Sequence, residues 1–182
     1  MFQVNLQKKY PDIRYNISSG NAEHVLEYLD KGIIDFGLLF TEIDTQKYEI
    51  IPVPIKDSWG VLMRKDSPLA RKESIQPQDL WDKPLIVSHQ KGDDVFLNQW
   101  LQRDESQLHI AATYNLILNA SLFIDEGLGY ALCYEKLINT NGSNLCFVLS
   151  FLNWKLVDIL YGKNTRFCLK LQKFSYNIFV RF

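Results

Sequence analysis

Residues 13–40 read IRYNISSGNAEHVLEYLDKGIIDFGLLF, and this stretch decides the fold class that we predict. Apolar and polar residues alternate over residues 13–18, as they do in a half-buried strand. A helix follows, with Asn21 as a good N-cap and Gly32 suited to the C′ position. Residues 33–40 are almost continuously apolar, as in a strand buried on both faces. Strand, helix and strand in this order predict a βαβ unit with parallel strands and a right-handed crossover.

The same alternation of strands and helices continues along the chain. Further strands are predicted at residues 48–55, 59–63, 85–87, 108–114 and 130–133, and further helices at residues 95–101 and 115–126. Pro52 and Pro54 favour an irregular or edge position for the first of these strands. The pattern therefore predicts an α/β protein of two small lobes joined near residues 59–66, with mixed parallel sheets flanked by helices.

Composition limits the class of protein. The 182 residues are 47% hydrophobic and 23% charged, which is typical of a globular chain with a sizeable core. A net charge of −1 argues against a basic surface for nucleic acid. Cys133, Cys146 and Cys168 include no C-x-x-C pair, so neither a disulfide framework nor a zinc site is expected. No apolar stretch approaches a membrane span and no signal peptide is visible, so we expect a cytoplasmic protein.

The sequence lacks the motifs that usually mark catalysis or cofactor binding. It has no P-loop, no dinucleotide-binding glycine motif, no zinc-protease helix and no nucleophile elbow. His24, His89 and His109 lack the spacing of metal ligands, so we expect no metal and no cofactor. The pairs Asp93-Asp94 and Asp104-Glu105 are more typical of solvated helix ends than of acid/base catalysis. We therefore expect a ligand-binding protein and no catalytic residues; a cytosolic enzyme that uses His89 with nearby carboxylates is a weaker alternative.

Several motifs together resemble the effector-binding domain of LysR-type transcriptional regulators. They are Tyr10-Pro11-Asp12-Ile13, Leu29-x-x-Gly32-x-x-Asp35-Phe36-Gly37-Leu38, Trp59-Gly60-Val61-Leu62-Met63, Asp66-Ser67-Pro68-Leu69-Ala70, Asp79-Leu80-Trp81-Asp82-Lys83-Pro84-Leu85-Ile86 and Glu126-Gly127-Leu128-Gly129-Tyr130-Ala131-Leu132. The resemblance covers residues 2 to about 147. It implies a two-lobed fold like that of periplasmic binding proteins, a small-molecule effector between the lobes, and homodimers through the lobes in intact relatives. A solute-binding protein of a transport system, which shares this fold class, is the alternative.

The candidate effector-binding residues follow buried strands, because open α/β sheets bind ligands beyond the carboxyl ends of their strands. Thr41 ends the buried strand of the first lobe, and Ser88 and His89 end the first strand of the second lobe. Asn115 begins a helix whose unpaired N–H groups suit an anion. A carboxylate-bearing metabolite is the predicted ligand class, which rests partly on the resemblance. A turn or capping role is an equally weighted alternative for each of the four residues.

The chain also departs from the family pattern. The winged helix-turn-helix and the first strand of the effector domain are missing, so we expect a partial gene product that does not bind specific DNA on its own. We predict lobe I at residues 1–60, without its first strand, and lobe II at residues 61–145. Residues 146–182 are predicted to be a divergent tail that replaces the return of the chain to lobe I.

The end of the chain differs in composition from the rest. Residues 151–182 carry six Lys and Arg against one Asp, with no Glu, Ala or Pro, whereas residues 1–150 carry 14 Lys and Arg against 20 Asp and Glu. The codons of residues 154–164 can also be read in the frame that begins at the third base of each codon. In that frame they can encode the tail expected of the family, including its Ile, Val, Trp, Lys, Lys run. We therefore expect a frameshift near residues 147–151, with a genuinely divergent end as the alternative. An out-of-frame tail should pack poorly, so we expect aggregation or a protease-resistant core within residues 60–145.

Overall fold

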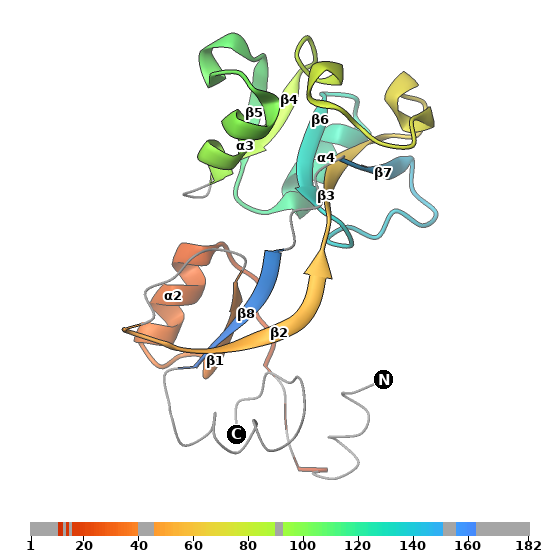
Figure 1. Cartoon of the computed structure of the whole chain (residues 1–182). Helices are drawn as coiled ribbons and strands as arrows, with labels where there is room; N and C mark the ends of the chain where they lie inside the picture. The colour runs from red at the N-terminus through yellow and green to blue at the C-terminus, as the bar shows by residue number, and fades with distance from the viewer. Residues whose placement is uncertain are drawn as a thin grey trace. The chain divides into compact units, whose positions relative to one another are not determined.

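The computed structural model describes residues 11–12, 14, 16–39, 46–89, 93–150 and 156–162. The chain divides into two compact units (Figure 1). Unit 1 comprises residues 1–56 and 157–182, and unit 2 comprises residues 57–156. The chain therefore passes from one unit to the other twice, near residues 57 and 156.

Unit 1 contains one described helix and a three-stranded sheet. The elements are α2 (Ala22–Asp30), β1 (Phe36–Leu39), β2 (Glu49–Asp57) and β8 (Leu156–Gly162), and the strand order is β1-β8-β2. The side chain of Asn21 accepts a hydrogen bond from the His24 N–H at 3.0 Å, and Gly32 has a φ of 66°, which confirms both predicted ends of the helix. Leu29 is fully buried and belongs to the apolar cluster of this unit.

The parallel βαβ unit predicted for residues 13–40 is wrong in the described part of this stretch. Residues 16–20 belong to no strand, and Ile17 is 76% exposed; positions 13 and 15 lie outside the described residues. The strand that follows the helix, β1, pairs instead with β8, and the pair is antiparallel. A strand is held by backbone hydrogen bonds to a neighbouring strand, and alternation of side chains alone does not supply that neighbour.

The apolar run at residues 33–40 is not buried on both faces. It forms β1 over Phe36–Leu39, where Leu38 is 38% exposed while Phe36 and Leu39 are buried. Helix α2 covers the face that carries Gly37, so closely that a Cβ there would lie 2.5 Å from Val25 Cγ1. Because successive residues of a strand point to opposite faces, Leu38 lies on the face away from α2.

Part of the tail also forms regular structure. We expected residues 151–182 to pack poorly, but β8 occupies the central place in the sheet of unit 1. Its register with β1 places Leu160 opposite Leu38. Backbone N–H and C=O groups pair irrespective of the side chains attached to them, so a strand of divergent sequence can still complete a sheet.

Unit 2 is built on a five-stranded mixed sheet. Its strands are β3 (Trp59–Arg64), β4 (Leu85–Ser88), β5 (Ile110–Tyr114), β6 (Tyr130–Tyr134) and β7 (Leu145–Leu149), in the order β5-β4-β6-β3-β7. Strand β4 is parallel to β5 and β6, whereas β3 is antiparallel to β6 and β7. The helices are α3 (Asp93–Leu101) and α4 (Ile117–Asp125), with short 3-10 helices at Pro68–Arg71, Pro77–Asp79 and Glu105–Gln107. The predicted α/β class with mixed sheets is confirmed.

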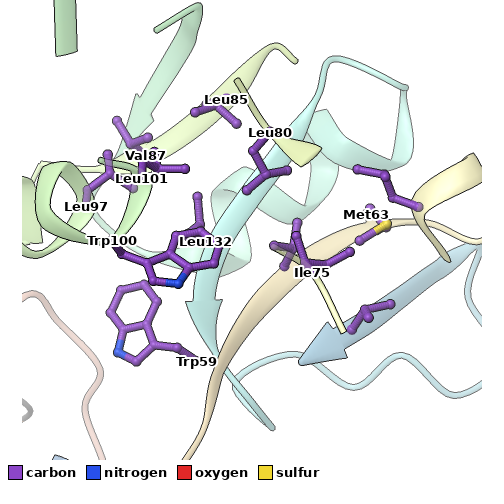
Figure 2. Packing of buried hydrophobic residues seen from close by; sticks show 13 residues of the cluster. Trp59, Met63, Ile75, Leu80, Leu85, Val87, Leu97, Trp100, Leu101 and Leu132 are labelled. Carbon is purple, nitrogen blue, oxygen red and sulfur yellow. The ribbon is translucent and has the colours of Figure 1, made fainter. Parts of the chain in front are cut away.

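The sheet of unit 2 separates two buried apolar clusters. Strand β3 supplies Val61 and Met63 to one cluster and Leu62 to the other, as expected from the alternation of a strand. The first cluster includes Trp59 and Trp100, which lie close together in Figure 2, and α3 covers this face. The second cluster includes residues of α4. Unit 2 is therefore a three-layer α/β/α arrangement, and its β4 and β5 end at one edge of the sheet.

Candidate ligand-binding site

Three of the four predicted ligand residues lie at one edge of the sheet of unit 2. Ser88 ends β4 and His89 follows it, while Asn115 follows Tyr114, the last residue of β5. Strands β4 and β5 are parallel neighbours with Ser88 opposite Tyr114, so their carboxyl ends coincide. This is the edge at which open α/β sheets bind ligands. Thr41 lies outside the described residues, and its role stays a prediction.

His89 is held at this edge by the carbonyl oxygen of Tyr114. That oxygen accepts a hydrogen bond from the His89 backbone N–H at 3.1 Å and lies 2.8 Å from the ring atom Nδ1. A carbonyl oxygen has no proton to give, so Nδ1 is the donor in this contact. The side chain is exposed, which leaves Nε2 as the ring nitrogen that a ligand can meet.

Tyr114 is a residue of this edge that the sequence did not single out. It is buried, and its hydroxyl donates a hydrogen bond to the Leu132 carbonyl oxygen of β6 at 2.9 Å. Because β4 lies between β5 and β6, the Tyr114 side chain spans β4 and fixes the carbonyl on which His89 rests. The one signal in the sequence was its place as the last residue of a predicted strand.

The prediction that Asn115 begins the helix is wrong. Helix α4 starts at Ile117, after an extended Leu116 with φ −130° and ψ 129°. The Asn115 side-chain oxygen accepts a hydrogen bond from Asn119 Nδ2 at 3.2 Å. The chain bends at residues 115 and 116, so the helix begins two residues later than predicted. The half-buried Asn115 amide still lies at the same edge as His89.

Other reactive side chains in the described residues do not form a second site. Burial raises the pKa of the Cys133 thiol to about 12 and also raises the pKa of Cys146, so both stay protonated and poorly nucleophilic. Within the described ranges, no three His, Cys, Asp or Glu side chains are grouped as metal ligands would be. No helix in that same part of the chain combines the length and the apolar character needed to cross a bilayer.

Two sequence comparisons agree on the family. The family model described as LysR substrate binding domain matches residues 4–150. The uncharacterized HTH-type transcriptional regulator YvbU of Bacillus subtilis is 34% identical over 130 residues, which cover 71% of this chain and 43% of that protein. The chain thus spans less than half the length of this relative.

Solved structures of LysR regulators share the fold at low sequence identity. HinK, a LysR family transcriptional regulator from Pseudomonas aeruginosa, is similar with a TM-score of 0.71 and 16% identity, over 90% of this chain and 58% of HinK. The CcmR regulatory domain of Synechocystis PCC6803, in complex with 2-PG, is similar with a TM-score of 0.72 and 17% identity, over 97% of this chain and 90% of that one. The fold is therefore that of the LysR effector-binding domains, which is like that of periplasmic binding proteins. With residues 4–150 matched by the family model, the chain belongs to the LysR substrate-binding domain family.

Proposed function

We propose that this chain is the effector-sensing domain of a LysR-type transcriptional regulator, and that it acts by binding a small molecule rather than by catalysis. Membership of the substrate-binding domain family is the observation that carries this proposal. The relatives compared above are regulators by name. A ligand that binds one conformation of such a domain more tightly shifts its equilibrium, and that shift is the signal.

The effector is proposed to bind at the edge of the unit 2 sheet formed by Ser88, His89 and Asn115, with Thr41 as a further predicted contact. The exposed imidazole, the neighbouring amide and the first N–H groups of α4 are all suited to an oxygen-rich anion. The 2-PG in the CcmR complex supports the idea that a domain of this fold binds a small ligand. We therefore propose a small oxyanion, with a carboxylate as the first class to test.

A thermal-shift screen of the full chain tests this proposal. The panel pairs each small carboxylate or phosphate ester with its neutral amide or alcohol. A bound effector at about 100 times its Kd stabilises the folded state by about 2.7 kcal/mol, so a true ligand raises the Tm. We expect the shift to be lost in His89→Ala and retained in His109→Ala. His109 is a matched control because it is also exposed and lies before β5, at the opposite end of that strand.

Two results of this screen would contradict the proposal. If no oxyanion raises the Tm of the wild-type chain, the ligand class is wrong. If an oxyanion stabilises wild type and His89→Ala equally, the location is wrong. Cell fractionation separates the regulator from the alternative of a transport solute-binding protein, which would be found outside the cytoplasm.

Self-association through α4 is part of the proposed function, since LysR regulators are oligomeric. Leu118 and Leu122 are one helical turn apart and are 64% and 66% exposed, and Phe123 beside them is also exposed. Large apolar side chains gathered on one helix face mark an interaction surface. We expect L118K/L122K to lower the mass of the chain in light scattering without changing its circular dichroism. An unchanged mass would place the interface elsewhere.

The unusual composition of residues 151–182 supports the further proposal that the tail is the product of a frameshift. Resequencing the locus tests this directly, because a single-base insertion or deletion would restore the tail expected of the family. We also propose that the 182-residue chain does not bind specific DNA alone, given its net charge of −1. A gel shift with sequence-selective binding at physiological salt would refute this.

A further inference from the structure

We propose that the binding of an oxyanion at this edge is coupled to the uptake of one proton by His89, so that acidification strengthens effector binding. This inference rests on the proposed function, since it concerns how the same edge recognises its ligand. His89 is then the residue that makes this edge prefer a negatively charged ligand. The charge preference of the ring depends on which of its two nitrogens already makes a hydrogen bond within the protein.

The contact with Tyr114 leaves one ring nitrogen to interact with a ligand. The carbonyl oxygen of Tyr114 lies 2.8 Å from Nδ1 and can only accept, so Nδ1 carries a proton in both charge states of the ring. In the neutral ring Nε2 therefore presents a lone pair, which repels a carboxylate or phosphate oxygen. In the protonated ring Nε2 presents an N–H and a positive charge. The ring need not turn to change from one state to the other.

The described residues next to His89 in β4 and just beyond Tyr114 of β5 have uncharged side chains. Strand β4 ends in the Ser88 hydroxyl, and beyond β5 lies the Asn115 amide. The Tyr114 hydroxyl is titratable, but it is buried and donates to the Leu132 carbonyl. The first carboxyl groups after the ring in the described sequence belong to Asp93 and Asp94, which begin α3.

The proton balance is simple. The oxyanion binds with its charge unchanged, a ring that is neutral before binding takes up one proton from the buffer at Nε2, and no covalent bond to the ligand forms. Because a histidine changes charge between about pH 5 and pH 8, the effect falls in the physiological range. A neutral ligand with a hydroxyl group lacks this preference, because the hydroxyl can donate to the lone pair on Nε2 or accept from its N–H. Acidification should therefore strengthen the binding of oxyanions and leave that of neutral analogues little changed.

Calorimetric titration of the full chain with sulfate and with acetate tests the coupling. The charge of both probes is constant between about pH 6 and pH 8, and chloride keeps the ionic strength constant. We expect about 10-fold tighter binding at pH 6 than at pH 8. Titrations in buffers of different ionisation enthalpy should show proton uptake that is larger at pH 8 than at pH 6, because more of the free rings are neutral there. In His89→Asn the amide can still donate to the Tyr114 carbonyl, but it lacks the second nitrogen and the charge. We expect this variant to fold normally, bind weakly and show no dependence on pH.

The controls separate this inference from the proposed function. His109→Asn should retain both the affinity and its pH dependence. If His89→Asn is unstable, His89→Gln serves as a second variant that lacks the titratable ring at position 89. Equal affinity at both pH values, or the same pH dependence in His89→Asn, would overturn proton coupling while leaving effector binding at this edge intact. Failure of every oxyanion to bind at either pH would overturn both proposals.

Discussion

Arg64 Nη1 donates a hydrogen bond to the carbonyl oxygen of Asp125 at 2.6 Å, which ties the end of α4 to the end of β3. The last carbonyls of a helix have no partner within the helix and carry partial negative charge. The same guanidinium makes two hydrogen bonds to the Asp66 carboxylate, at 2.9 and 2.6 Å. Arg64 therefore connects the end of a helix, the end of a strand and a turn. A lysine has the same charge but lacks the planar, forked guanidinium, so it cannot replace Arg64 in these contacts.

Replacing Arg64 by Ala should lower the free energy of unfolding, because the helix end loses a charged hydrogen-bond donor. Arg64→Lys should recover only part of this loss. Lys83→Ala is the control, since Lys83 forms an ion pair with its exposed neighbour Asp82, and such surface pairs contribute little to stability. Urea unfolding followed by tryptophan fluorescence measures the difference. Equal effects of the two alanine variants would show that the contact with Asp125 contributes little.

Gly60→Ala should be severely destabilising, by about 2–4 kcal/mol. A Cβ at position 60 would lie 2.3 Å from the Val148 carbonyl oxygen and 2.5 Å from the Phe147 ring, so β3 and β7 would have to separate. Gly142→Ala is the matched control, because its Cβ would meet no atom within 4 Å and only its φ of 74° would be strained. We expect this control to cost about 1 kcal/mol. Thermal melts of both variants test the contrast, which would be absent if β3 and β7 were not paired closely.

The stability of the chain should fall in alkaline solution because of Cys133. Burial raises the pKa of its thiol to about 12, whereas an unfolded cysteine titrates near 8.5. Above that lower value the unfolded state loses the proton that the folded state keeps, so the free energy of unfolding decreases as pH rises toward about 12. Cys133→Ala should flatten this slope relative to wild type. Urea unfolding at a series of pH values, together with alkylation of Cys133 only after unfolding, checks both parts.

Leu160→Pro should disrupt unit 1 and leave unit 2 folded. Proline removes a backbone donor from β8, which is the central strand of the three-stranded sheet and pairs at this position with Leu38. Hydrogen exchange should therefore accelerate at Phe36–Leu39 but not in β4 or β6. Leu137→Pro, in a turn between β6 and β7, does not touch this sheet and serves as a control for unit 1. Unchanged exchange in β1 after Leu160→Pro would mean that β8 does not hold it.

Local patterns were sufficient to predict most of the elements. The helix at Ala22–Asp30, with Asn21 before it and Gly32 after it, follows from side-chain capping and from a backbone conformation that suits glycine. The strand Leu85–Ser88 follows from an apolar run bounded by polar residues. The motifs that resemble LysR effector-binding domains also lie within short stretches, and the family match over residues 4–150 confirms that resemblance.

The amino-acid sequence by itself determined the α/β class, the positions of most helices and strands, and the family, because these depend on residues close together in the chain. Only the tertiary structure decided which segments pair: residues 16–20 form no strand, and β1 lies beside β8 from the other end of the chain. It also decided that His89 rests on the carbonyl of Tyr114, 25 residues away, and so which ring nitrogen can meet a ligand. Such contacts depend on the closure of long loops and on competition between strands for one edge, which no local pattern of side chains records.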